Sequence, residues 1–194
     1  MKKELKTTTA EALLGMLSLR AMSGYELRQA IESSIGNFWS ESFGQIYPTL
    51  KRLERDGFVS ADEGGRAGSK VYSLTESGRE RLGRWLEVMP QPQVPRNELL
   101  LKLFFGNLLP PERLSEQVAG WRRGLVAELT LYQARAAELS KRMAGRPGLP
   151  FWLMTLRHGE LRTKALIEWC DETLAQLEAM ARLKDESAFE EVTR

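Results

Sequence analysis

Residues 42–57 carry the clearest periodic pattern in the chain. At about 100° per residue, their apolar positions fall on one side of a predicted helix, and these are Phe43, Ile46, Leu50 and Leu53. The cationic positions fall almost opposite, and these are Lys51, Arg52 and Arg55. A helix that packs by one side and presents cations on the other suits the major groove of DNA.

The two ends of this helix have their own signals. Pro48 removes one helical hydrogen bond, so we expect either an irregular first turn or a kink at this residue. Gly57 can adopt the left-handed conformation that ends a helix.

The next segment has the pattern of a β-wing. Residues 58–61 and 70–74 are strand-like, and residues 62–69 between them contain three glycines and Arg66. This composition predicts a hairpin whose tip carries one cation that can reach a DNA backbone or minor groove. Thr75 then predicts the start of another helix.

Three capping-box patterns mark helix starts, namely Thr8-x-x-Glu11, Ser23-x-x-Glu26 and Ser42-x-x-Gln45. They predict helices over residues 9–19 and 24–34 and at the start of the cationic segment. The order of helix, helix, helix, strand, strand, helix is that of a winged helix-turn-helix domain. We therefore predict a mainly α fold with a small β-wing.

Three prolines in residues 90–95 predict an extended connector. This gives a DNA-binding domain over 1–89, a linker over 90–95 and a helical domain over 96–194. In the last domain, a short helix (97–105) precedes two long helices separated by a break at 145–148. The final helix repeats apolar positions nearly every seven residues, with Glu160 and Thr163 as polar interruptions.

Two long helices joined by a tight break pack as an antiparallel hairpin. Such a hairpin has little core of its own, so a second copy of the chain is the economical partner. We predict a homodimer through five apolar positions of these helices: Leu125, Leu129, Ile167, Leu174 and Leu177.

Several motifs resemble those of the PadR family of bacterial transcriptional regulators. They are Ser23-Gly24-Tyr25-Glu26-Leu27, the string from Gly44 to Leu53, Tyr72-Ser73-Leu74-Thr75 with Gly78, and the apolar run from Glu98 to Gly106. The second string is the most specific, and the resemblance covers nearly the whole chain. It implies a dimeric repressor that responds to small molecules or stress, often to phenolic or other aromatic compounds.

The predicted DNA contacts are Tyr25, Ser42, Gln45, Tyr47, Thr49, Lys51, Arg52, Arg55, Arg66 and Lys70. Most of them have a plainer alternative. The tyrosines can pack the domain surface, the cations can form a solvated face, and Gln45 can read adenine or complete a capping box.

An aromatic effector suggests a pocket near Trp121, Trp152 and Trp169, although aromatic residues at helical spacing are more often core. Cys170 falls on the apolar repeat, which favours packing over redox sensing. His158 is the single histidine and has no partners for a metal site or a catalytic triad.

Composition sets limits on the function. The formal net charge of +2 is small for a nucleic-acid binder, so the case for DNA rests on how the charges are arranged. One cysteine excludes an intrachain disulfide. No apolar run approaches the roughly 20 residues of a membrane span, so we expect a cytoplasmic protein.

Three function classes remain. We favour a DNA-binding regulator, a repressor that binds an inverted-repeat operator as a homodimer and is released by a small-molecule effector. The alternative is a winged-helix module for protein–protein contact. An enzyme is disfavoured, because no catalytic set, metal-ligand cluster or phosphate-cradling glycine loop is present, and we expect no cofactor.

Overall fold

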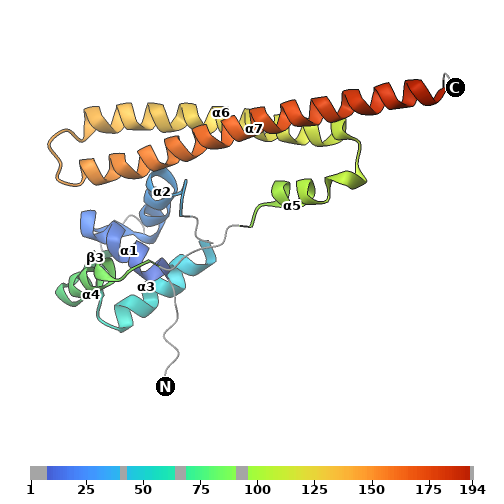
Figure 1. Cartoon of the computed structure of the whole chain (residues 1–194). Coiled ribbons are helices and arrows are strands. Elements are labelled where there is room, and N and C mark those ends of the chain that lie inside the picture. Colours follow the sequence, from blue (N-terminus) through green and yellow to red (C-terminus); the bar gives the residue numbers. More distant parts are fainter. Residues whose placement is uncertain (1–7, 40–42, 64–68, 91–95, 193–194) are drawn as a thin grey trace. The chain divides into compact units, whose positions relative to one another are not determined.

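The computed structural model describes residues 8–39, 43–63, 69–90 and 96–192, with side chains for all of these except 43 and 184–192. The chain forms two compact units, Met1–Gln93 and Val94–Arg194, which are described separately. Helices dominate both units, and one small sheet lies in the first (Figure 1). The predicted fold class is confirmed.

Four helices form the N-terminal unit: α1 (Thr8–Leu19), α2 (Gly24–Ser34), α3 (Ile46–Arg55) and α4 (Glu76–Glu87). The capping box of α2 is present, because the Glu26 N–H donates to Ser23 Oγ at 3.3 Å and the Ser23 N–H donates to Glu26 Oε2 at 2.8 Å. Thr75 caps α4 by accepting the Gly78 N–H at 3.1 Å. These two predicted starts are confirmed.

The sheet has three antiparallel strands in the order β1–β3–β2: β1 (Met22–Ser23), β2 (Val59–Glu63) and β3 (Lys70–Leu74). Strands β2 and β3 form the predicted wing, and Gly57 precedes it with a φ of 76°. Strand β1 was not predicted, because two residues are too short to show a period. It places Met22 opposite Tyr72 on the central strand.

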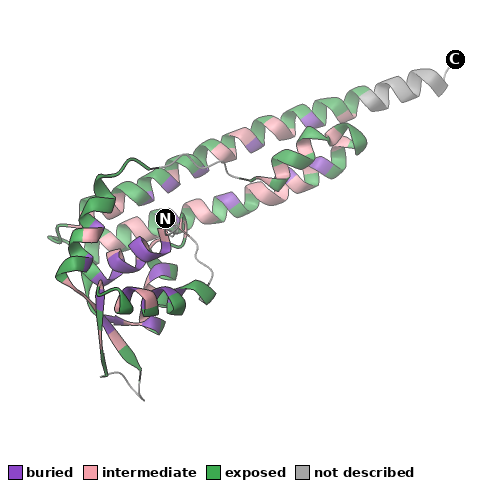
Figure 2. Ribbon diagram, turned by 90° about the horizontal axis from the view of Figure 1, so that it is seen from below, coloured by how far each residue is buried: buried purple, intermediate pink, exposed green. Residues whose placement is uncertain are grey.

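The core of this unit is formed where the helices meet the sheet. Figure 2 shows its buried positions on the inward faces of the helices. Ile46, Leu50 and Leu53 of α3 are all buried in it, which confirms the predicted apolar side of this helix. Phe43 was expected on the same side, but its side chain lies outside the described residues.

The start of α3 differs from the prediction. The α-helix begins at Ile46 rather than near Ser42, after a 3₁₀ turn over Phe43–Gln45. Pro48 is therefore the third helical residue, where a backbone N–H would have no partner within the helix. The irregular first turn was one of the two expected outcomes. Gln45 is the N-cap residue and its side chain makes no capping bond.

The C-terminal unit contains α5 (Glu98–Phe104), a 3₁₀ turn (Gly106–Leu108), α6 (Pro111–Arg142) and α7 (Leu149–Val192). Helices α6 and α7 lie side by side as a hairpin (Figure 1). Cys170 is fully buried in the core between them. Thr163 of α7 is also fully buried, and its hydroxyl has no hydrogen-bond partner among the described residues. One expected polar interruption therefore lies inside the core.

In the part of the chain that the structure describes, no helix is both long enough and apolar enough to cross a membrane.

Candidate nucleic-acid interface

The outward side of α3 presents a row of exposed groups. Lys51 and Arg55 are exposed, and Tyr47 is 54% exposed at the start of the helix. Arg55 donates to the Asp56 carboxylate at 2.9 Å, and Arg52 is half-buried. The buried leucines on the opposite side fix the rotation of the helix, so the cationic side faces solvent.

Thr49 does not belong to this row. Its side chain is 4% exposed, because it lies on the packed side of α3 next to Leu50 and Leu53. In this position Thr49 offers almost no exposed surface for the predicted DNA contact.

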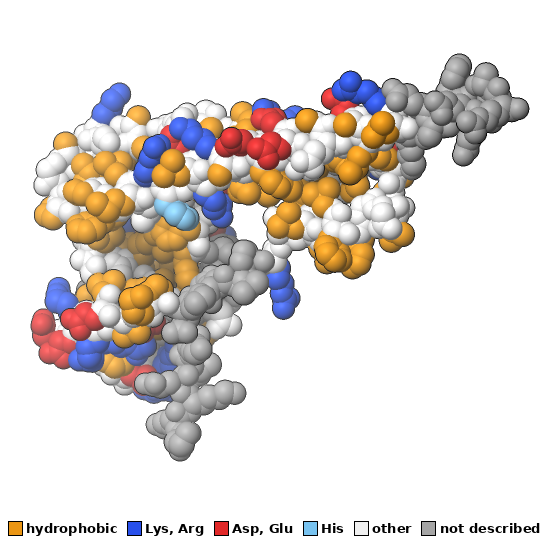
Figure 3. Space-filling view, viewed as in Figure 1, with side chains coloured by type: hydrophobic (Ala, Val, Ile, Leu, Met, Phe, Trp, Pro, Cys, Tyr) orange, Lys and Arg blue, Asp and Glu red, His pale blue; other side chains and the backbone are white. Residues whose placement is uncertain are grey.

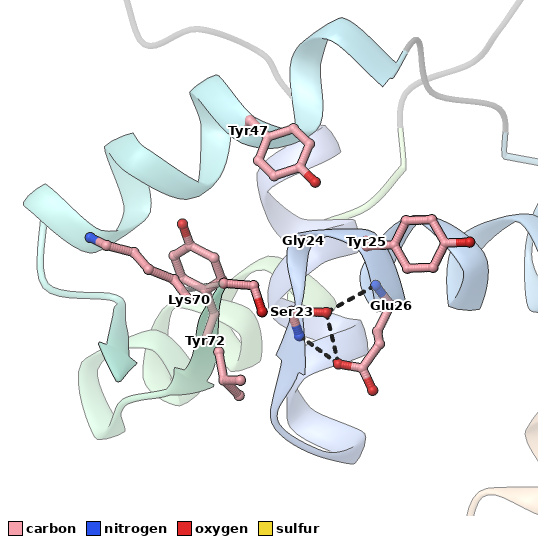
Figure 4. A pocket seen from close by; sticks show the side chains of 9 residues that line it. Ser23, Gly24, Tyr25, Glu26, Tyr47, Lys70 and Tyr72 are labelled. Carbon is pink, nitrogen blue, oxygen red and sulfur yellow. Dashed lines mark hydrogen bonds between the residues drawn. The ribbon is translucent and has the colours of Figure 1, made fainter. Parts of the chain in front are cut away.

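A groove of about 730 Å³ lies beside this helix (Figure 4). Three segments that are distant in sequence form its walls: the start of α2, the start of α3 and strand β3. Its lining residues are Ser23, Gly24, Tyr25, Glu26, Tyr47, Ser69, Lys70, Val71 and Tyr72. The structure thus brings the predicted residues Tyr25, Tyr47 and Lys70 together around one hollow.

Gly24 allows the ring of Tyr47 to approach the first turn of α2. A Cβ atom at Gly24 would lie 2.5 Å from Cε1 of Tyr47, which is closer than any real contact. The absence of a side chain at Gly24 therefore makes room for the Tyr47 ring in this position. Sequence reasoning missed this contact, because nothing in the spacing of the two residues reveals it.

The first turn of α2 holds one strongly acidic carboxyl group. Hydrogen bonds from the Ser23 backbone and side chain, and then from Arg20, lower the pKa of Glu26 to about 2. Arg20 Nη1 lies 3.0 Å from Glu26 Oε1, so the carboxylate charge is partly neutralised within α2 and its approach.

This pKa predicts a defined acid sensitivity. Because the folded-state pKa of Glu26 lies below the usual 4.5, its stabilising contribution is complete above that value and is lost as the pH falls towards about 2. Substituting Glu26→Gln is expected to remove this part of the pH dependence. Urea unfolding of both proteins between these pH values checks it, with NMR titration of the Glu26 carboxyl carbon. A carboxyl group that titrates near 4.5 would contradict the prediction.

Strand β3 contributes Lys70 and Tyr72, which point to the same face of the strand. Lys70 Nζ lies 2.8 Å from Glu54 Oε1 of α3, and this hydrogen bond raises the pKa of Lys70. Tyr72 is 5% exposed, and burial raises the pKa of its hydroxyl. Glu54 and Tyr72 were not predicted as site residues, although the two-residue period of the strand already placed Tyr72 beside Lys70.

The remaining predicted contacts are distributed around this site. Gln45 is exposed, and the Tyr25 hydroxyl accepts a hydrogen bond from Gln29 at 3.0 Å. Ser42 and Arg66 lie outside the described residues.

The C-terminal unit separates the three tryptophans that were expected to form a pocket. Trp121 and Trp169 pack edge to face with ring centroids 5.7 Å apart. Trp152 lies 17 residues before Trp169 on α7, roughly 25 Å away along a helix. The structure therefore brings two of the three together.

The five predicted dimer residues are either buried or half-buried within the single chain. Leu125 and Leu177 are buried in the core of their own hairpin, with Ile167 and Leu174 half-buried against it. Leu129 is half-buried. Burial also raises the pKa of the Cys170 thiol, as expected of a packing residue.

Comparison with known proteins places these units in a family. Residues 13–84 match the model of the transcriptional regulator PadR-like family, and residues 95–178 match the model named virulence activator alpha C-term. The negative transcriptional regulator PadR of Bacillus subtilis is 30% identical over 177 residues, covering 86% of this chain and 96% of that protein.

Solved structures agree along nearly their full length. Bacillus subtilis PadR in complex with operator DNA matches with a TM-score of 0.77 and 28% identity, over 88% of this chain and 99% of that one. The same protein in complex with p-coumaric acid matches with a TM-score of 0.74 and 29% identity, over 89% and 99%. The Vibrio cholerae virulence activator AphA matches with a TM-score of 0.73 and 30% identity, over 89% and 99%. The family consists of transcriptional regulators and not of enzymes. This chain belongs to the PadR-like family of transcriptional regulators.

Proposed function

We propose that this protein is a homodimeric repressor that binds an inverted-repeat operator through the outward side of α3. The observation that carries this proposal is the rotation of α3, which buries Ile46, Leu50 and Leu53 while Lys51 and Arg55 remain exposed. The relative in Bacillus subtilis was crystallised with operator DNA, and it shares this fold.

A dimer through the C-terminal unit is supported by its exposed apolar side chains. On and after α5, Phe104 is 81% exposed and Leu108 is 76% exposed, and hydrophobic groups gather over this helix in Figure 3. Covering them with a second copy gains about 25 cal/mol per Å² of apolar area. Twofold symmetry then sets half-sites one or two helical turns apart, roughly 10 or 20 bp.

A small aromatic effector completes the proposal. The Bacillus subtilis relative was crystallised with p-coumaric acid, and here Trp121 and Trp169 offer paired aromatic rings. A ligand that binds one arrangement of the dimer better than another shifts the operator affinity by its coupling free energy, typically about 1–3 kcal/mol. Such a regulator works in the cytoplasm, where the DNA is.

Footprinting on the DNA upstream of the coding region tests the function. We expect protection of an inverted repeat and binding that weakens steeply with salt, with a slope of about −0.9 per phosphate neutralised. Binding to an acidic protein but to no DNA would favour the protein–protein module instead. If transcription in vitro rises when the protein is added, the protein is an activator and not a repressor.

Gly24 gives a variant that separates DNA affinity from stability. Replacing Gly24→Ala places a methyl group against the Tyr47 ring, which is exposed enough to turn outward. We expect operator affinity to fall by about fivefold, a cost comparable to one hydrogen bond, while the unfolding midpoint stays the same or rises slightly. Fluorescence anisotropy and thermal unfolding measure the two effects. Parental affinity in this variant would show that the position of Tyr47 has no part in binding.

A further inference from the structure

The hydroxyl of Tyr72 occupies an unusual position. Tyr72 lies on the central strand, its ring is part of the core, and the residue lines the groove between α2 and α3 (Figure 4). Its hydroxyl makes no hydrogen bond to any residue that the structure describes. A buried tyrosine usually directs its O–H to a partner. The ring is packed, but the hydroxyl itself reaches the open groove, where its proton can be donated to water or to an accepting atom of a ligand.

The surroundings indicate an anion. The positive end of α2 opens on the groove at Gly24 and Tyr25, and Lys70 contributes a cation from the same face of β3 as Tyr72. Burial raises the pKa of the Tyr72 hydroxyl, so it stays protonated and can donate at neutral pH.

Two carboxylates limit which anion fits. Glu26 lies in the groove wall, where Ser23 and Arg20 engage its oxygens, and Glu54 holds Lys70 at 2.8 Å. The cations near the groove are thus already balanced, and a free anion gains little by entering. A backbone phosphate of a bound duplex is different, because the contacts of the duplex along α3 hold it in place. It can therefore enter the groove although the nearby cations are already paired with carboxylates.

We propose that this groove seats one backbone phosphate of the operator in each half-site and that the Tyr72 hydroxyl donates a hydrogen bond to it. The proposal rests on the DNA-binding function proposed above and adds a residue to it. A neutral donor orients the phosphate and releases no counterion of its own. Tyr72 therefore fixes the register of the N-terminal unit on the duplex, and Lys51 supplies the positive charge that attracts the phosphates.

The test uses the full-length chain and the operator that footprinting defines. Replacing Tyr72→Phe keeps the ring and removes only the hydroxyl. We expect operator binding about tenfold weaker, an unchanged salt slope and an unchanged or raised unfolding midpoint, because no internal hydrogen bond is lost. A matched control is Tyr132→Phe, which alters a buried tyrosine of α6 whose hydroxyl donates to Glu128, and which should bind DNA like the parent.

Operators that each carry one methylphosphonate then identify the phosphate. We expect the parent to lose affinity at one symmetric pair of positions and the Tyr72→Phe variant to lose much less there, because the contact is already gone. If the Tyr72→Phe variant binds the operator as tightly as the parent, the proposed phosphate site is wrong, but the proposed DNA-binding function is unaffected. A variant weakened equally on every modified operator would overturn the phosphate site too, since that pattern indicates a purely structural role.

Two further outcomes are decisive. Calorimetry with inorganic phosphate is expected to show no saturable binding at millimolar concentration. Saturable binding that Tyr72→Phe abolishes would assign the groove to a free anion and overturn the DNA assignment. A parent chain that binds no DNA at all would overturn the proposed function, and the seat with it.

Discussion

Replacing Lys51 by glutamate is expected to weaken operator binding about 100-fold, with folding and dimerisation intact. Lys51 is exposed on the outward side of α3 and has no ion pair with any described residue, so its charge is available to a phosphate. In both subunits of the dimer, the substitution replaces attraction between residue 51 and a DNA phosphate by repulsion. Gel shifts at several salt concentrations should show the salt slope falling by about 1.8, because two phosphate contacts are lost.

The control reverses the same charge on another helix of the same unit. Arg79 is exposed on α4, and Arg79→Glu changes the net charge equally. We expect this variant to change the operator affinity only slightly, because Arg79 acts on the DNA only through the long-range electrostatic field of the protein. Equal losses in both variants would mean that net charge, and not the side of α3, controls affinity. Sedimentation should find both variants dimeric.

The second large effect concerns stability. A Cβ atom at Gly78 would lie 2.1 Å from the backbone oxygen of Phe58, which cannot move away as a flexible side chain can. That oxygen also accepts the Thr75 N–H at 3.2 Å, next to the cap of α4. We expect Gly78→Ala to lower the free energy of unfolding by about 3 kcal/mol, measured by urea denaturation. DNA affinity should fall together with the stability, because α4 and the wing belong to the same folded unit as α3.

Gly83 offers a matched control in the same helix. It is exposed, and a Cβ atom there would meet nothing within 4 Å. Alanine is a better helix former than glycine, so Gly83→Ala should raise the free energy of unfolding by about 0.5–1 kcal/mol. Opposite signs for the two substitutions would confirm that close approach at Gly78 is the cause. Destabilisation of similar size in both would contradict it.

The periodic pattern predicted much of the N-terminal unit because its elements are regular and capped. The rotation of α3 followed from the spacing of its apolar residues, and the helix starts at Ser23 and Thr75 followed from their caps. The start of α3 was misplaced because the sequence pattern Ser42-x-x-Gln45 has the form of a capping box, whereas a 3₁₀ turn over Phe43–Gln45 precedes the α-helix, which begins at Ile46. The same spacing, read more strictly, places Thr49 with the buried residues.

The C-terminal unit shows a different limit of sequence patterns. A seven-residue repeat indicates that a helix has a partner, but it does not say whether the partner is in the same chain. Leu125 and Leu177 were assigned to a dimer and are already buried by the hairpin. Side chains outside the repeat, such as Phe104 and Leu108, are the exposed ones. The groove residues could not be predicted as a group, because only folding brings α2, α3 and β3 together.

The ion pair between Lys70 and Glu54 has a consequence for the cost of recognition. It links the wing to the last turn of α3, although an exposed pair contributes no more than about 1 kcal/mol. The pair therefore favours one orientation of the two elements before any duplex arrives. Less conformational entropy is lost when the head docks, and this preorganisation leaves more of the contact energy available as affinity.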